Sequence, residues 1–158
     1  MRGISSLLLL FAVGIVASAA TAGPVKPRPE IMGVGLDMKR DDARARLKSI
    51  GSLEKEERKR QEVWAIKDAR ISHLLIGYDA DYRVRYVTAI ARTNGPRIRY
   101  QEVADLKSAQ RTVTQGNHKF TWEVERRGQL AFILIARGRD PQYLDSYSVK
   151  KKDQEEID

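Results

Sequence analysis

Few side chains in this sequence could do acid–base or metal chemistry, and they are scattered. The two histidines, His73 and His118, are 45 residues apart. The chain contains no H-E-x-x-H zinc motif, no G-x-S-x-G nucleophile turn, no P-loop and no dinucleotide fingerprint. His73 shares the parity of Ile71 and Leu75 in a strand-like run, which favours a core or boundary position. His118 follows Gly116-Asn117 in a loop-like stretch.

Two pairs of carboxylates are the remaining candidates. Asp79 and Asp81 flank a predicted turn, but calcium takes about six to eight oxygen ligands, and turn preference explains both residues. Glu123 and Glu125 stand on one face of a predicted strand, as polar side chains do wherever a sheet meets water. We therefore predict no catalytic residue, no metal and no cofactor, and we keep a small secreted hydrolase with an unrecognised site as the third interpretation.

Positive charge is in excess, because 29 Lys and Arg residues against 21 Asp and Glu give a net charge of +8 at pH 7. Such a field attracts anionic partners, for example lipid headgroups, lipopolysaccharide or cell-wall polymers. Surface solubility is the alternative explanation, since many of these residues have an acidic neighbour in the sequence. The candidate anion-binding residues are Arg97, Arg99, Arg126, Arg127, Arg137 and Arg139.

The first 22 residues have the pattern of a secretory signal peptide. Arg2 precedes an apolar run from Ile4 to Val16, and small residues lead to an A-x-A site at Ala20-Thr21-Ala22. A membrane anchor needs about 20 apolar residues, which this run does not reach. We expect cleavage near Ala22/Gly23, a periplasmic or secreted location, no transmembrane segment in the mature chain and no nucleic-acid partner.

We expect one domain, at residues 35–149, between two ends that do not fold. Residues 23–34 contain three closely spaced prolines and predict an extended linker. Residues 150–158 contain one apolar residue and predict a charged disordered tail. Hydrophobic residues make up 42% of the chain, enough for one core. The absence of cysteine excludes disulfides, thiolate metal sites and cysteine nucleophiles.

The elements that position the candidate residues begin with a helix. Asp37 is suited to cap its first turn, and Gly51 to end it in a left-handed conformation. The stretch Glu54–Glu62 has no apolar residue, so residues 52–62 predict either a short exposed helix or a loop. The apolar stripe of the helix comprises Leu36, Ala43, Leu47 and Ile50.

From Val63 the hydrophobic period becomes that of strands. Val63–Lys67 and Ile71–Tyr78 are rich in aromatic and β-branched residues, and a turn at Asp79-Ala80-Asp81 leads into Tyr82–Ile90. The alternation is typical of an antiparallel sheet that packs on one side, against the helix. The residues predicted to share one face of the third run are Tyr82, Val84, Tyr86, Thr88 and Ile90.

The second part of the chain repeats the order of helix and then strands. Tyr100–Lys107 predicts a short helix, and Phe120–Glu125 alternates like a strand. Leu130–Ala136 is a continuous apolar run, as expected of a central strand covered on both faces, and Tyr143–Val149 is expected at the sheet edge. The predicted fold class is α+β, with one or two helices packed on a meandering antiparallel sheet of about five or six strands.

Residues 33–91 also resemble a known family. Gly35-Leu36-Asp37 opens the helix and Ile50-Gly51 closes it. Trp64 lies on the next strand, and Leu74-Leu75-Ile76-Gly77-Tyr78-Asp79 leads to Arg83-Val84 and Val87. In this order the chain resembles the SmpA/OmlA (BamE-like) domain and the β-lactamase-inhibitor-protein-like fold.

The resemblance implies a compact, non-enzymatic module of the bacterial envelope that works by contact with other proteins, sometimes in outer-membrane assembly. Two features depart from the family. Members that act in assembly are commonly lipoproteins, whereas this chain has no cysteine to acylate. The part of the chain that contains Trp122 lies beyond a minimal unit of the family.

We therefore expect an exported module that binds another envelope or secreted protein through a sheet face or an exposed strand edge. A basic binder of anionic surfaces is the alternative function. Partner contacts are commonly made by large aromatic side chains. The candidates are Trp64, Tyr78, Tyr86 and Trp122, for each of which core packing is the competing explanation.

Overall fold

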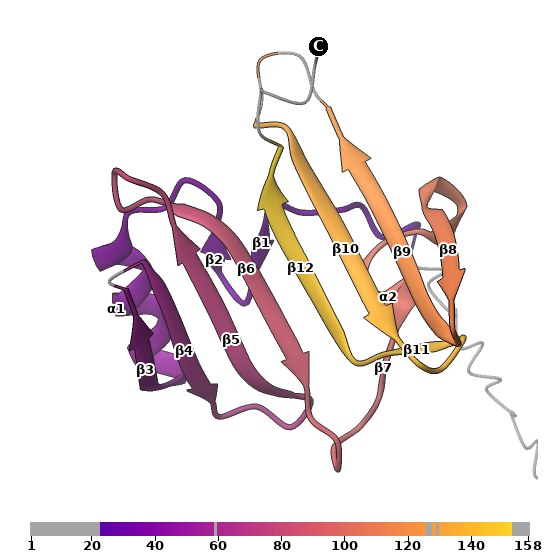
Figure 1. Ribbon diagram of the computed structural model, residues 1–158, viewed down its shortest axis with the longest axis horizontal. Coiled ribbons are helices and arrows are strands. Elements are labelled where there is room, and N and C mark those ends of the chain that lie inside the picture. The colour runs from indigo at the N-terminus through magenta and orange to yellow at the C-terminus, as the bar shows by residue number, and fades with distance from the viewer. Residues whose placement is uncertain (1–22, 59, 126–127, 129, 153–158) are drawn as a thin grey trace, which may run out of the picture.

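The computed structural model describes residues 23–58, 60–125, 128 and 130–152. Its main element is an antiparallel sheet of eight strands in the order β3-β4-β5-β6-β12-β10-β9-β8, shown in Figure 1. The sheet strands are β3 (Gly51–Glu57), β4 (Gln61–Ile66), β5 (Ile71–Tyr78), β6 (Val84–Ala91), β8 (Gln110–Thr114), β9 (Asn117–Val124), β10 (Phe132–Gly138) and β12 (Ser146–Lys151). The other elements are β1 (Glu30–Ile31), β2 (Val34–Gly35), α1 (Arg40–Ile50), β7 (Ile98–Arg99), α2 (Tyr100–Val103), the short 3-10 helix η1 (Leu106–Ser108) and β11 (Tyr143–Leu144).

This architecture corrects the predicted fold class. Strands make up 52% of the described residues and helices 14%, so the fold is mainly β rather than one or two helices on five or six strands. Two strands of the eight-stranded sheet were not predicted: β3, within the stretch 52–62 that we expected to be a helix or a loop, and β8; they form the two edges of the sheet. Nearly all their side chains are exposed. Because solvent surrounds both strands, their sequences carry no alternation that could reveal them.

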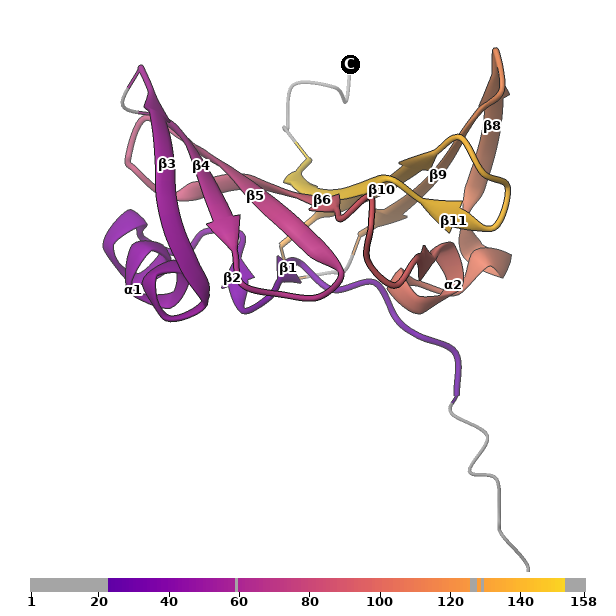
Figure 2. The same ribbon diagram turned by 90° about the horizontal axis from the view of Figure 1, so that it is seen from below.

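All the covering elements lie on one side of the sheet. Figure 2 shows α1 below the β3–β6 half, α2 below the other half, and the β1–β2 hairpin between them. Both edge strands curve away from these elements, so the opposite side is concave. We call this concave side the open face. Within the described residues, no helix or strand packs on it.

The sheet consists of two halves with the same order of elements. In the first, α1 precedes β3, β4, β5 and β6; in the second, α2 and η1 precede β8, β9, β10 and β12. The last strands of the two halves pair with each other, from Ser146 opposite Ile90 to Lys150 opposite Tyr86. The prediction that Tyr143–Val149 forms an edge strand is therefore wrong, because this long-range pairing makes β12 a central strand.

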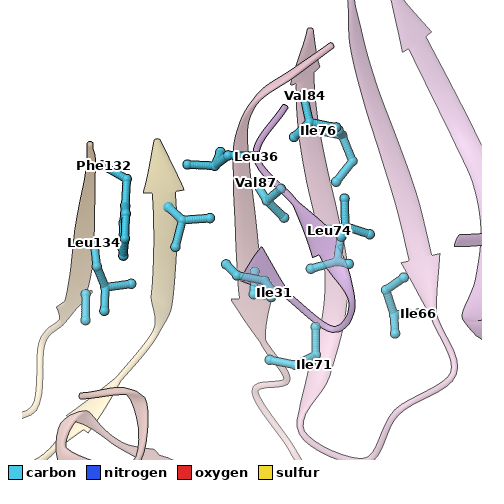
Figure 3. Close-up of a cluster of buried hydrophobic side chains, with 14 of the residues drawn as sticks. Ile31, Leu36, Ile66, Ile71, Leu74, Ile76, Val84, Val87, Phe132 and Leu134 are labelled. Carbon is cyan, nitrogen blue, oxygen red and sulfur yellow. The ribbon is translucent and has the colours of Figure 1, made fainter. Parts of the chain in front are cut away.

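One buried cluster fills the space between the sheet and its covering layer. In Figure 3, Leu74 and Val87 point from the sheet toward the layer that contains Ile31. Ala43 and Leu47 of α1 are completely buried, as the predicted apolar stripe requires. In the described part of the chain, no helix has the length and apolar character needed to cross a membrane.

The two ends of α1 differ from the prediction. Asp37 lies before the helix with φ 66° and pairs with Lys151, so it does not cap the first turn. Lys39 occupies the N-cap position without a side-chain cap. Gly51 has φ −170°, which is extended backbone, and it begins β3 rather than closing the helix in a left-handed conformation. Glycine is required there because a Cβ atom would overlap the backbone oxygen of Ala65.

Irregular pairing of β5 with β6 changes which residues face the core. The register shifts between Ile71 and His73 and again between Gly77 and Tyr78. As a result Val84 is buried on the covered side, whereas Tyr86 and the residues at 88 and 90 lie on the open face. The predicted common face from Tyr82 to Ile90 is therefore divided by a bulge.

Strand β10 is covered on one side only. Phe132 and Leu134 point into the core, and the alternating residues Ile133 and Ile135 point to the open face. The prediction that this apolar run is covered on both faces is wrong within the described residues, because the concave sheet carries no second layer.

Parts of the predicted linker and of the predicted tail have structure. Ile31 and Val34, inside the segment predicted as a linker, are buried in the core. Val25 accepts a backbone hydrogen bond from Asp105 at 2.8 Å. Lys150 and Lys151, inside the predicted tail, belong to β12. The predicted signal peptide, residues 1–22, and residues 153–158 lie outside the described residues.

Candidate functional site

The register of the sheet places three rows of side chains on the open face. Residues directly opposite each other in an antiparallel sheet point to the same side. The middle row runs across all eight strands as Lys55, Val63, Leu75, Thr88, Ser148, Ile135, Thr121 and Gln110. One flanking row is Ser52, Ala65, His73, Ile90, Ser146, Arg137, Lys119 and Thr112. The other is Glu57, Gln61, Gly77, Tyr86, Lys150, Ile133 and Glu123.

The middle row has an uncharged centre. From Val63 to Thr121 it contains aliphatic and hydroxyl side chains only, and all of them are half-buried. Thr88 and Ser148 share a hydroxyl hydrogen bond of 2.9 Å across the junction of the two halves. The side chains of Thr88 and Ser148 are short, so no large side chain of the middle row projects from the open face where β6 meets β12.

The flanking rows and the edges carry the charge. His73 lies 3.2 Å from Glu54, between Nε2 and Oε2. On the other half, Lys119, Arg137 and Lys150 make no ion pair with any described residue. The open face therefore has a largely apolar centre. Positive and negative charges balance at its β3 end, and positive charge is in excess at its β8–β12 end. This resembles protein interfaces, which combine an apolar centre with a polar rim.

Tyr86 is the predicted contact residue that lies on the open face. Its ring covers Gly77, where a Cβ atom would overlap the ring carbons. Its hydroxyl donates to Oε1 of Gln61 at 2.9 Å. Burial raises the pKa of Tyr86, so the hydroxyl keeps the proton that it donates. The ring is thereby fixed flat against the sheet.

The three other predicted contact residues lie on the covered side. Trp64, Tyr78 and Trp122 have exposed fractions of 1%, 5% and 1%. Their large aromatic surfaces fill the core, and their polar atoms find partners there. The Nε1 atom of Trp122 donates to the carbonyl of Asp105 at 2.8 Å. These side chains do not present a contact surface.

Trp64 and Tyr78 share a buried carboxylate, Glu62, which the sequence analysis missed. Trp64 Nε1 donates to Oε2 of Glu62 at 2.8 Å, and the Tyr78 hydroxyl donates to the same oxygen at 3.0 Å. Arg44 Nε donates to the other oxygen, Oε1, at 2.7 Å. Burial, with the nearby Glu62 carboxylate, raises the pKa of Tyr78 above its ordinary range. The Trp64 indole, the Tyr78 phenol and the Arg44 guanidinium all donate to this one carboxylate, which therefore links α1 to the sheet.

The four described arginines of the predicted anion-binding set have different surroundings. Arg97 pairs with Asp140 at 3.0 Å. The guanidinium groups of Arg97 and Arg99 lie 4.1 Å and 5.8 Å from the centroid of the Tyr143 ring. Arg139 lies 3.8 Å from Asp145. Arg137 is on the open face. Arg126 and Arg127 lie outside the described residues.

The candidate acid–base residues are dispersed. His73 is on β5, whereas His118 is on β9 with its Nδ1 atom 3.1 Å from Arg111 Nη2. Glu123 and Glu125 both pair with Lys152. Asp79 accepts backbone hydrogen bonds from the residues at 81 and 83, as a turn carboxylate does. Within the described ranges, no three His, Asp or Glu side chains gather as a metal site.

Two hollows in the described part of the chain bear on ligand binding. The larger, of about 790 Å³, is on the covered side between the N-terminal segment and Tyr147. Three of its charged groups are engaged there: Arg70 donates to Glu102 at 2.6 Å, and Asp68 accepts from backbone amides. The smaller, of about 360 Å³, is on the open face beside β8. Its lining includes Lys119 and Arg137, which have no ionic partner in the described part of the chain.

Comparisons with family models, with curated proteins and with solved structures find no match to this chain. The resemblance to the SmpA/OmlA family therefore stays a prediction from the residues that suggested it.

Proposed function

We propose that this chain is an exported, non-catalytic module that binds another envelope or secreted protein through the open face of its sheet. The observation that supports the proposal most strongly is the one-sided cover of the sheet. Both helices and the β1–β2 hairpin lie on the convex side, and the concave side carries no element among the described residues. A sheet that packs on one face only leaves the other available for a partner.

The size of the open face fits this function. Eight strands about 4.8 Å apart and three rows about 6.8 Å apart give a patch on the order of 800 Å². A standard protein–protein interface buries about 800 Å² on each partner. The uncharged middle row would form the centre of the interface, and the charged flanking rows its rim.

Site-specific photo-crosslinking in the native compartment tests the proposal. A photoreactive residue at Thr121 or Lys150 samples the open face, and one at Lys48 or Gln101 samples exposed positions of the two helices. We expect Thr121 and Lys150 to give the same protein adduct, and the helix positions to give none. Adducts from Lys48 and Gln101 alone would place the partner on the convex side and overturn the proposal.

Binding to an anionic surface is the second candidate, because Lys119, Arg137 and Lys150 have no ionic partner within the described residues. Binding driven by such charges falls steeply as salt rises. Flotation with phosphatidylglycerol vesicles at low and high salt measures it. The protein-binding function predicts no association with the vesicles, whereas salt-sensitive association that the triple alanine variant at 119, 137 and 150 abolishes would favour the second candidate.

A further inference from the structure

The two edges of the sheet differ in how they are protected against pairing with another strand. Edge strands in soluble proteins are commonly protected by bulges and by charged side chains. Strand β3 has both: its register with β4 shifts between Leu53 and Lys55, and residues 54–57 are all charged. This edge is therefore a poor template for a further strand.

Strand β8 has neither protection. Its five residues pair with β9 in unbroken register, from Gln110 opposite Thr121 to Thr114 opposite Asn117. Two threonines and Val113, which is 52% exposed, give it a high preference for the strand conformation. Its one charged residue, Arg111, is exposed, and its guanidinium lies against the Phe120 ring and His118 of the neighbouring strand β9. No described strand pairs with the outer edge of β8, so its outward backbone groups are available.

The open-face hollow of about 360 Å³ lies directly beside this edge. Thr112 and Thr114 of β8 form one wall, and the opposite residues Lys119 and Arg137 supply two cations. The acid of the lining, Asp145, accepts from the backbone N–H of Arg139 at 3.1 Å. Of the Lys, Arg, Asp and Glu side chains that line the hollow, two are cations and one is a carboxylate, so the hollow presents net positive charge together with hydroxyl groups.

We propose that β8 receives an extended acidic segment of a partner protein as a ninth strand of the sheet. The added strand would lie about 4.8 Å beyond β8, with alternate side chains on the open face. Carboxylates on that side would stand next to Thr112 and Thr114 and above the hollow. Lys119, which lines the hollow from β9, would be two strands away from these carboxylates. In Figure 2, β8 curves toward the concave side of the sheet.

The chemistry of the edge selects a protein segment over other anions. Backbone pairing requires a strand, which a lipid headgroup or a polymer of sugars does not supply, and the main-chain hydrogen bonds of strand addition provide affinity. The cations select an acidic sequence over a basic one. This inference deepens the proposed function by naming the chemistry of the partner segment, and it rests on that function only in taking the partner to be a protein.

A pair of synthetic peptides tests the inference on the purified protein. One is the blocked peptide Thr-Glu-Val-Glu-Val-Glu-Thr, and the other has lysine in place of each glutamate. Fluorescence anisotropy measures affinity, and amide hydrogen exchange measures protection along the chain. We expect the glutamate peptide to bind about tenfold more tightly or better at low salt. We also expect it to slow exchange within Gln110–Thr114.

Charge reversal separates recognition from general attraction. The double variant Lys119→Glu with Arg137→Glu is expected to reverse the preference in favour of the lysine peptide. Its matched control, Lys48→Glu with Lys67→Glu, has the same net charge and places the changes at exposed positions away from β8. We expect the control to keep the preference. Unfolding midpoints of both variants show that they remain folded.

Four results would overturn the inference. Equal affinity for the two peptides would mean that the cations do not select an acidic segment. The same loss of preference in the control variant would mean that net charge alone acts. Binding without slower exchange in β8 would mean an anion-binding hollow and no added strand. Self-association that protects β8 would make a second copy the occupant. None of these results touches the proposed function, because crosslinking from Thr121 and Lys150 tests the open face independently of the edge.

Discussion

Removing the carboxylate of Glu62 should loosen helix α1 from the sheet. The side chain is 1% exposed, although glutamate is rarely buried without a partner. It receives hydrogen bonds from Arg44 on the helix, from Trp64 on its own strand and from Tyr78 on the next strand. One side chain therefore joins three elements.

The size of the effect follows from what the donors lose. Breaking a buried ion pair by removing one partner costs about 3–5 kcal/mol. Arg44 is 27% exposed and recovers part of its hydration, whereas the indole N–H and the phenol lose their acceptor, at about 1–3 kcal/mol each. Because these losses overlap, we expect Glu62→Ala to lower the free energy of unfolding by about 4 kcal/mol. Glu62→Gln keeps one acceptor oxygen, and we expect about half that loss.

Urea unfolding followed by tryptophan fluorescence measures these changes, since Trp64 and Trp122 are both buried. The matched control is Glu56→Gln. Glu56 pairs with the same Arg44 at 3.0 Å, but its side chain is 35% exposed, so the loss should stay below about 1 kcal/mol. If Glu62→Ala and Glu56→Gln destabilised the protein equally, the buried carboxylate would not hold the helix and the reasoning would fail.

Three further predictions concern the core and its ionisable groups. Gly51→Ala should lower the free energy of unfolding by about 1–3 kcal/mol, because the new methyl group meets the backbone oxygen of Ala65, whereas Gly35→Ala, with its nearest neighbour at 3.8 Å, should change it little; chemical denaturation compares the two. Trp122→Ala should cost about 3–5 kcal/mol and Thr121→Ala, on the open face, less than about 0.5 kcal/mol; similar losses in the same assay would mean that the two faces of β9 are wrongly assigned. Burial raises the pKa of Tyr100 to about 12, while an unfolded tyrosine ionises near pH 10. The stability that the neutral Tyr100 contributes is therefore fully present below pH 10 and falls as pH rises toward 12. Urea titrations at several alkaline pH values check this, and a flat profile over that range would contradict it.

The sequence predicted those parts of the fold that have a buried face with a regular period. Ala43 and Leu47 identify the helix because residues four apart meet the core, whereas Leu36 of the predicted stripe lies in the turn before α1. Phe120 and Trp122 identify β9 because alternate residues do. The edge strands β3 and β8 have no such face, and one of them is almost entirely charged. Periodicity carries no information about a strand that solvent surrounds.

The remaining errors arise from contacts between distant parts of the chain. The central position of β12 depends on its pairing with β6, about 60 residues earlier in the sequence. The bulge near Gly77 places Val84 and Tyr86 on opposite faces of the sheet, and a strict period of two in the sequence does not reveal it. Both features determine which side chains reach the open face, so the candidate surface was harder to predict than the core.

The candidate site itself was predicted only in part. The four predicted contact residues are large and aromatic, and three of them lie in the core because aromatic side chains bury the most apolar surface. The open face is formed instead by short side chains such as Thr88 and Ser148. One signal was present in the sequence: Ser146, Ser148 and Lys150 alternate with Tyr147 and Val149, which is the pattern of a strand with one polar face.

The central claim is that a partner covers the open face where the protein works. The chain has no cysteine, so Ser148→Cys provides one thiol in the middle of that face and Lys48→Cys provides one on the exposed surface of α1. Labelling of each variant with a maleimide is compared between the purified protein and the native compartment. We predict that Ser148→Cys reacts readily when purified and slowly in the compartment, while Lys48→Cys reacts alike in both. Equal reactivity of Ser148→Cys in the two settings would contradict the claim.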